Sequence, residues 1–162
     1  MLKYLLAGIA VLVVVGLLRR DAGSPVKASA EIDIDAPLDK VWGVQTDFAR
    51  WKEWNADIEE MKMNGPVAAG SKFVWKAGGM TIHSTIQDVA DRRHIIWTGK
   101  TLGTDATHKW EFSSVNGVTH VYTEEEFTGA LPWLLPGTMR GMLQKALQHG
   151  VQVLKVASEK NN

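Results

Sequence analysis

The sequence contains no cysteine. This absence excludes a disulfide framework, a thiolate zinc site, catalysis by a thiol and lipid attachment through cysteine. The five histidines show no HxH or HExxH spacing and no carboxylate cluster accompanies them, so the sequence predicts no metal site. A nucleophile elbow and a phosphate-binding glycine loop are also missing, and we expect no cofactor.

An excess of basic residues is lacking as well, because 18 Lys and Arg balance 18 Asp and Glu. Residues 1–30 hold four of the basic side chains and one of the acidic ones, which leaves 14 basic and 17 acidic side chains after residue 30. A folded part with a formal charge of −3 presents no basic stripe, which argues against a nucleic-acid partner.

Only one long apolar run is present, at residues 4–18, and it lies between Lys3 and Arg19-Arg20. A helix of this length spans about 22 Å, against a hydrocarbon core of about 30 Å. We expect residues 4–18 to contact the membrane, either as a retained anchor or as a signal segment that is cleaved on export. If the segment is retained, the positive-inside rule favours a cytoplasmic domain by a narrow margin.

The chain is therefore divided into three parts. Residues 1–20 are the expected N-terminal membrane anchor or signal segment. Residues 21–30, which include glycine, serine and proline, are expected to form a flexible linker. Residues 31–160 are about the size of one domain.

The pattern in residues 31–160 predicts an α+β domain. A first strand at residues 31–35 leads into a helix that Pro37 opens, and a second short helix or ordered loop follows up to Asp57. Further strands, separated by turn signals, are expected at residues 61–63, 71–77, 81–89, 94–100 and on both sides of Asn116-Gly117. Residues 138–160 have the period of one long amphipathic helix. We expect a curved antiparallel sheet of six to seven strands wrapped around this helix.

The dipeptide Asn116-Gly117 is the strongest hairpin signal in the chain. A two-residue turn there pairs Val115 with Val118 and places His108 opposite Glu125 on the apolar face of the sheet. Facing Cβ atoms lie roughly 4.5 to 5.5 Å apart, so imidazole and carboxylate could hydrogen-bond. A longer loop with a bulge would separate the pair.

The order and spacing of several short segments resemble the START-like, or SRPBCC, superfamily, in its bacterial polyketide cyclase/dehydrase-like branch. The matching segments are Ala36-Pro37 with Val41-Trp42, Thr46-Asp47 with Trp51 and Trp54-Asn55, Phe73-Val74-Trp75-Lys76, Ser84-Thr85-Ile86, Ile96-Trp97-Thr98-Gly99, His108-Lys109-Trp110, Thr123-Glu124-Glu125 with Gly129, and Leu154-Lys155. The resemblance implies a helix-grip fold with a deep cavity, in a superfamily whose members bind lipids, sterols or polyketides or act on them. It supplies no catalytic signature.

We expect His108 and Glu125 to lie in a cavity lined by aromatic rings, either as an acid/base pair or as a buried structural pair. The expected sheet residues of the lining are Phe73, Trp75, Ile86, Trp97, Trp110, Phe112, Val121, Thr123 and Phe127. The expected helix residues are Met139, Met142, Leu143 and Leu147. His83 is expected to point outward from its strand.

Three functions agree with this interior. The first is the binding of a hydrophobic small molecule or lipid near a membrane. The second is a cyclase, dehydratase or isomerase reaction with His108 and Glu125 as the acid/base pair, and the third is a membrane-tethered interaction module. The proline-bounded segment Leu131–Pro136 either packs under the long helix or stays exposed where it can touch a membrane. The oligomeric state is left open.

Overall fold

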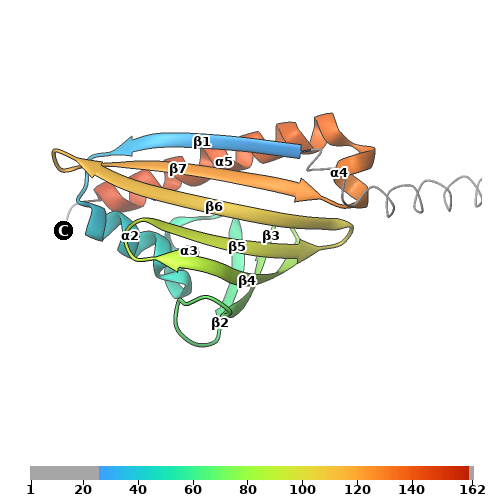
Figure 1. The fold of residues 1–162 in the computed structure, drawn as a ribbon, viewed down its shortest axis with the longest axis horizontal. Coiled ribbons are helices and arrows are strands. Elements are labelled where there is room, and N and C mark those ends of the chain that lie inside the picture. The colour runs from blue at the N-terminus through green and yellow to red at the C-terminus, as the bar shows by residue number, and fades with distance from the viewer. Residues whose placement is uncertain (1–25, 161–162) are drawn as a thin grey trace, which may run out of the picture.

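The computed structural model describes residues 26–160, in which seven strands form one antiparallel sheet and a long helix lies within its curve (Figure 1). The elements are β1 (Val26–Ile34), α2 (Leu38–Thr46), the 3-10 helix η1 (Phe48–Arg50), α3 (Trp51–Trp54), β2 (Ile58–Met63), β3 (Lys72–Ala77), β4 (Met80–Ala90), β5 (His94–Thr101), β6 (Thr104–Val115), β7 (Val118–Thr128), α4 (Ala130–Leu134) and α5 (Pro136–Glu159).

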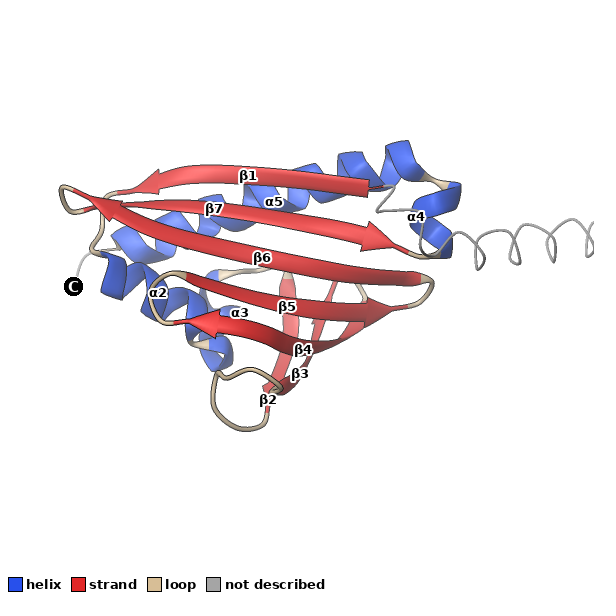
Figure 2. Ribbon diagram, viewed as in Figure 1, coloured by secondary structure: helices blue, strands red, loops and turns tan. Residues whose placement is uncertain are grey.

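The strand order β1-β7-β6-β5-β4-β3-β2 follows from short turns between successive strands from β3 to β7, from a longer loop between β2 and β3, and from β1 pairing beside β7. Figure 2 shows the helices gathered on the concave side of this sheet. The predicted helix-grip architecture is confirmed, including the two short helical segments after the first strand.

The hairpin register is also confirmed. Asn116 and Gly117 form a two-residue turn with φ angles of 53° and 84°, and the pairs Val115↔Val118 and His108↔Glu125 follow from it. His83 is exposed, as its place in the alternation of β4 predicted.

Strand β1 begins at Val26, whereas the sequence analysis placed a flexible linker up to residue 30. Val26 and Ala28 are buried and pair with Phe127 and Glu125 of β7. The period-two alternation of apolar residues, visible from Ile34 back to Val26, explains why the strand is longer than predicted.

Helix α5 buries one stripe of its surface, formed by Leu143, Leu147, Val151 and Leu154. Its first half packs on β1, where Leu143 and Leu147 join Val26 and Ala28 in a small core. Its second half joins the main core beneath β5, β6 and β7.

The segment Leu131–Pro136 contributes the short helix α4 and the start of α5. Pro132 is buried, but Leu131, Leu134 and Leu135 are 38%, 46% and 51% exposed. Of the two placements considered for this segment, the exposed one is observed.

No helix within residues 26–160 has the length and hydropathy needed to cross a bilayer. The expected anchor or signal segment, residues 1–20, lies outside the described residues, as do residues 21–25 of the expected linker.

Candidate functional site

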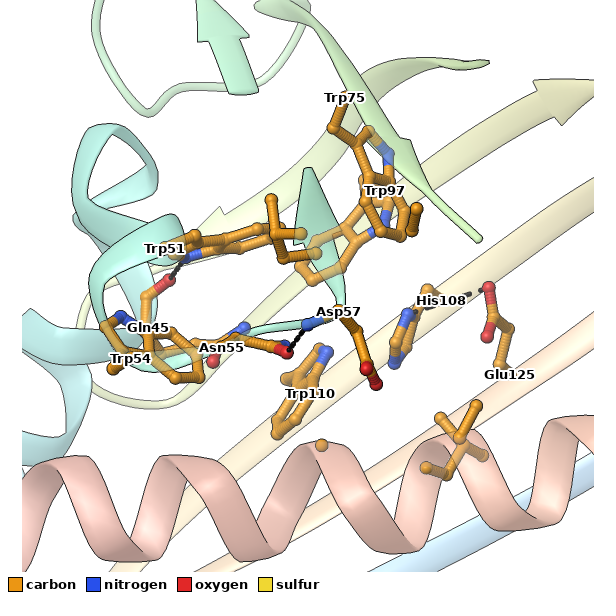
Figure 3. A pocket seen from close by; sticks show the side chains of 15 residues that line it. Gln45, Trp51, Trp54, Asn55, Asp57, Trp75, Trp97, His108, Trp110 and Glu125 are labelled. Atoms are coloured by element: carbon orange, nitrogen blue, oxygen red, sulfur yellow. Dashed lines mark hydrogen bonds and ion pairs between the residues drawn. The ribbon is translucent and has the colours of Figure 1, made fainter. Parts of the chain in front are cut away.

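A cavity of about 190 Å³ lies between the sheet, α3 and α5 (Figure 3). Its walls are mainly five indole rings, those of Trp51, Trp54, Trp75, Trp97 and Trp110. The other lining residues are Gln45, Asn55, Asp57, Ile58, Ala77, His108, Glu125, Ala146, Leu147 and Gly150.

Local structure explains how these rings meet. Trp75, Trp97 and Trp110 belong to β3, β5 and β6, and their side chains lie on the inner face of the sheet. Trp51 and Trp54 are three residues apart in α3, so both rings lie on the same side of that turn, with centroids 6.5 Å apart. Gly150 of α5 faces the ring of Trp110, and a Cβ atom at this position would make ordinary van der Waals contact with it, 3.8 Å from Trp110 Cη2.

The hydrogen-bond donors of these rings divide into two groups. Trp51 Nε1 donates to the carbonyl of Gln45 at 2.8 Å, and Trp75 Nε1 donates to the hydroxyl of Ser84 at 3.0 Å. Trp54 Nε1 and Trp110 Nε1 are buried without a partner, and so is the acceptor Gln45 Oε1. A buried polar atom without a partner costs about 1–3 kcal/mol, so three residues of the cavity lining carry unmet hydrogen bonds at atoms that the surrounding packing seals from solvent.

His108 is held between two of the rings. Its imidazole lies 4.8 Å from the Trp97 ring and 5.4 Å from the Trp110 ring, centroid to centroid. The hydroxyl of Thr123 donates to the carbonyl of Lys109 at 3.0 Å, so its oxygen must accept a hydrogen bond from His108 Nε2, 2.8 Å away. This bond places the proton of the neutral imidazole on Nε2 and leaves Nδ1 as a lone pair.

That lone pair faces Glu125. His108 Nδ1 and Glu125 Oε1 are 3.6 Å apart, which is close but longer than a hydrogen bond. Figure 3 shows the two side chains approaching each other from neighbouring strands at one end of the cavity.

Burial keeps both groups uncharged near neutral pH. It raises the pKa of Glu125 from 4.5 to about 8, and it lowers the pKa of His108 from 6.5 to about 3. The indole rings exclude the water that would solvate either charge. The pair is therefore a carboxylic acid beside a free imidazole lone pair, and the 3.6 Å contact is not an ion pair.

Three polar residues lie where the loop between α3 and β2 meets α5. The backbone N–H of Asp57 donates to Asn55 Oδ1 at 3.0 Å, which fixes the chain between α3 and β2. The carboxylate of Asp57 is exposed and lies 3.5 Å from Nε2 of His149 in α5. This contact links α5 to the loop between α3 and β2, beside the cavity.

The structure brings together only part of the predicted lining. Trp75, Trp97, Trp110 and Leu147 line the cavity together with His108 and Glu125. The remaining predicted lining residues are placed elsewhere. Phe73, Ile86, Phe112 and Val121 lie in the main core, Thr123 lies behind His108, and Leu143, Phe127 and Met139 belong to the small core beside β1.

Met142 was predicted to face the interior, and this is wrong. Its side chain is 58% exposed, because it lies about 100° around α5 from the buried Leu143. The apolar stripe of the helix is narrower than the run of apolar residues in its sequence.

Sequence reasoning missed the part of the cavity that α2, α3 and the following loop provide. Trp51 and Trp54 belong to the segment before Asp57 that was expected to be a short helix or an ordered loop, but nothing local shows that this segment closes one side of the cavity. Gly150 had a detectable signal, because a glycine in the middle of an amphipathic helix suggests close packing against another group.

Within residues 26–160, no three His, Asp or Glu side chains are close enough together to hold a metal ion. The lining offers apolar contact, a few directed hydrogen bonds and one neutral acid, which suits an organic ligand.

Solved structures with the same fold share little sequence with this chain. A START superfamily protein from Mycobacterium smegmatis superposes with a TM-score of 0.71 at 15% identity, covering 83% of this chain and 97% of its own. TTHA0849 from Thermus thermophilus superposes with a TM-score of 0.70 at 16% identity, and the match covers 82% of this chain and 96% of TTHA0849. DynU16, from the dynemicin biosynthetic locus, superposes with a TM-score of 0.68 at 19% identity. The match covers 83% of this chain but only 47% of the DynU16 chain.

No curated protein sequence matches the chain. A family model described as polyketide cyclase/dehydrase and lipid transport matches residues 25–159, which is nearly the whole of the described structure. With the START-like fold, this match establishes that the chain belongs to the polyketide cyclase/dehydrase and lipid transport family.

Proposed function

We propose that the chain binds a small, neutral, ring-containing molecule that carries a hydrogen-bond acceptor. The observation that carries this proposal is the set of unpartnered polar atoms in the cavity wall. Trp110 Nε1 and Gln45 Oε1 belong to side chains that are only 5% and 2% exposed, and neither atom has a hydrogen bond. A ligand acceptor that pairs with Trp110 Nε1, after a small rotation of the ring opens this sealed atom to the cavity, recovers free energy that the free protein lacks, whereas Gln45 Oε1 needs a ligand donor.

The cavity volume limits the size of the ligand. Drug-sized ligands occupy pockets of about 300–1,000 Å³, whereas a cavity of about 150 Å³ in another protein admits benzene. At about 190 Å³, the cavity suits a molecule of one or two rings better than a sterol or a long acyl chain.

The lining also selects for a neutral ligand. It contains no lysine or arginine, and its two acidic residues are the exposed Asp57 and the protonated Glu125. An anionic ligand would have no cation to replace its lost hydration, which disfavours its binding. A carbonyl or phenol oxygen directed at Trp110 Nε1 meets the available donor without a charge.

The test compares two ligands that differ in one acceptor, naphthalene and acetylnaphthalene, by isothermal titration calorimetry. We expect both to bind, and acetylnaphthalene to bind more tightly. Trp110→Phe keeps a ring but removes the N–H group, so it should weaken acetylnaphthalene about tenfold and change naphthalene much less.

Trp75→Phe is the matched control, because the N–H of Trp75 is already bonded to Ser84 and is not available to a ligand. It should not alter the preference between the two ligands. Failure of both ligands to bind the wild-type protein, with no small molecule retained in native mass spectrometry, would refute the proposed binding function.

A second candidate is acid/base catalysis, which the neutral pair of His108 and Glu125 favours. His108 Nδ1 would remove a proton from a carbon beside a carbonyl, while Glu125 gives its proton to the carbonyl oxygen to form an enol. In a dehydration, the enol returns its proton to Glu125, and the departing β-hydroxyl takes the proton from His108 and leaves as water.

Burial makes His108 a weak base, so we place binding before catalysis. The catalytic candidate predicts that a bound ketone exchanges its α-hydrogens with D₂O. This exchange should be lost in His108→Gln while acetylnaphthalene still binds. Exchange at the uncatalysed rate in the wild-type protein would exclude this chemistry for that ketone.

We also propose that residues 4–18 keep the domain at a membrane, on its cytoplasmic side. The support is the apolar run between Lys3 and Arg19-Arg20. Protease protection in spheroplasts tests the orientation. A domain that is digested only after the inner membrane is opened has the cytoplasmic placement, and digestion in intact spheroplasts contradicts it.

A further inference from the structure

One end of the domain presents four leucines to solvent. Leu102, Leu131, Leu134 and Leu135 are 89%, 38%, 46% and 51% exposed, and we call them the leucine surface. Single exposed leucines are ordinary, but several at one end of a domain indicate an interaction site.

Close backbone packing joins the two parts of this surface. The N–H of Leu131 in α4 donates to the carbonyl of Gly103 in the β5–β6 turn at 3.1 Å. A Cβ atom on Gly129 would lie only 2.7 Å from the same carbonyl oxygen, and one on Gly103 would lie 3.1 Å from Leu131 Cγ. Two glycines thus let the turn and the helix approach each other, which holds Leu102 beside α4.

The chain enters the domain at the same end. Val26, the first residue of β1, pairs with Phe127, which precedes the first residue of α4 by three positions. Figure 1 shows the start of β1, the end of β7 and α4 together at this end of the sheet.

The length of chain before Val26 limits the distance to the apolar run. Residues 19–25 are the only ones between residues 4–18 and β1, and this length spans at most about 25 Å even when fully extended. The leucine surface therefore lies at the end of the domain to which these seven residues connect the apolar run.

We propose that the leucine surface inserts into the interfacial layer of the same bilayer that residues 4–18 enter. The proposal goes beyond ligand binding, because it concerns the outer surface and not the cavity. The contact is apolar and not electrostatic, since the chain after residue 30 has a formal charge of −3 and no attraction for anionic lipids. It orients the domain with α4 toward the lipid and the β6–β7 turn away from it.

The absence of cysteine allows this orientation to be measured in the full chain. Leu102→Cys and Leu134→Cys, each labelled with an NBD fluorophore, report on the leucine surface. Val115→Cys is the matched control, since it replaces a side chain that is apolar and 69% exposed. It lies at the other end of β6, about 40 Å away along the strand.

The labelled chains are reconstituted into phosphatidylcholine vesicles with or without doxyl-labelled phosphatidylcholine. We expect the doxyl lipid to quench NBD at residues 102 and 134 at least threefold more strongly than at residue 115, independently of salt. Because the replaced side chains are exposed, circular dichroism should show the wild-type fold for all three variants.

Equally weak lipid quenching at the three positions, in chains that remain with the vesicles, would overturn the proposal. Protection of residues 102 and 134 from both doxyl lipid and aqueous iodide would also overturn it, because a protein surface would then cover the leucines. A full chain that does not stay with the vesicles refutes the proposal as well.

Discussion

Glu125→Gln should change how the stability of the protein depends on pH. The carboxyl of Glu125 lies beside His108 at one end of the cavity, its side chain is 14% exposed, and burial raises its pKa to about 8. Glutamine has nearly the same shape but does not titrate, so the comparison isolates the protonation of one buried group.

The sign follows from the protons that each state binds. Between pH 4.5 and about 8 the folded protein keeps the proton of Glu125, whereas the unfolded chain has lost it. The stabilisation that Glu125 provides is therefore complete below pH 4.5 and declines as the pH rises to about 8. His108 acts in the opposite direction. Its folded pKa of about 3 lies below the ordinary 6.5, so its contribution rises from about pH 3 to pH 6.5.

The two effects overlap between pH 4.5 and pH 6.5, where they cancel. The decline due to Glu125 alone then extends from pH 6.5 to about pH 8. One pKa unit corresponds to about 1.4 kcal/mol, so the wild-type protein should lose about 2 kcal/mol of unfolding free energy over this window.

Urea unfolding at pH 6.5 and pH 8, followed by tryptophan fluorescence, measures this loss. Glu125→Gln should remove it, while the neighbouring Glu126→Gln should keep it, because Glu126 lies on the outer face and pairs with Lys27. If the wild-type protein and Glu125→Gln show the same change between the two pH values, Glu125 is not a buried neutral acid and the reasoning fails.

Three further predictions concern the cavity and its surroundings. Gly150→Ala should raise the unfolding free energy, measured by urea unfolding, by up to about 1 kcal/mol, because alanine favours a helix more than glycine does and its Cβ would meet only ordinary contacts here. Gly150→Leu should fill the cavity and abolish the binding of acetylnaphthalene, which calorimetry measures. Thr123→Val should cost about 1–3 kcal/mol in urea unfolding and should shift the ¹⁵N resonances of His108 away from the Nε2–H tautomer, and unchanged resonances would contradict the assigned bond. Gly129→Ala should cost about 1–3 kcal/mol or more, because its φ of 111° is strained for alanine and its Cβ would collide with the carbonyl of Gly103; a thermal midpoint equal to that of the wild type would disprove this.

Local patterns were sufficient for most of the fold. Asn116-Gly117 specified its own turn, and period-two alternation then placed His108 opposite Glu125 without knowledge of any other contact. The helical period of residues 138–160 predicted α5 in the same way. These features are predictable because the residues that decide them are neighbours in the sequence.

The composition of the cavity was less predictable. Phe73 and Trp75 lie two residues apart on the same face of β3, yet Phe73 fills the core against Phe48 and Trp75 lines the cavity. Their different roles depend on where η1 and α3 cover the sheet, which no alternation encodes. The prediction that Met142 lines the cavity was wrong for a related reason. The side of α5 that meets the sheet is set by packing against β1 and not by the helix sequence alone.

The strand and helix order, the facing pair of His108 and Glu125, and the absence of thiol chemistry follow from the sequence alone. Three other features depend on tertiary contacts: five tryptophans surround one cavity, two indole N–H groups have no partner, and Glu125 is neutral near pH 7. Periodicity fixes directions along an element, whereas burial, pKa and hydrogen-bond satisfaction depend on atoms that segments far apart in the sequence bring together.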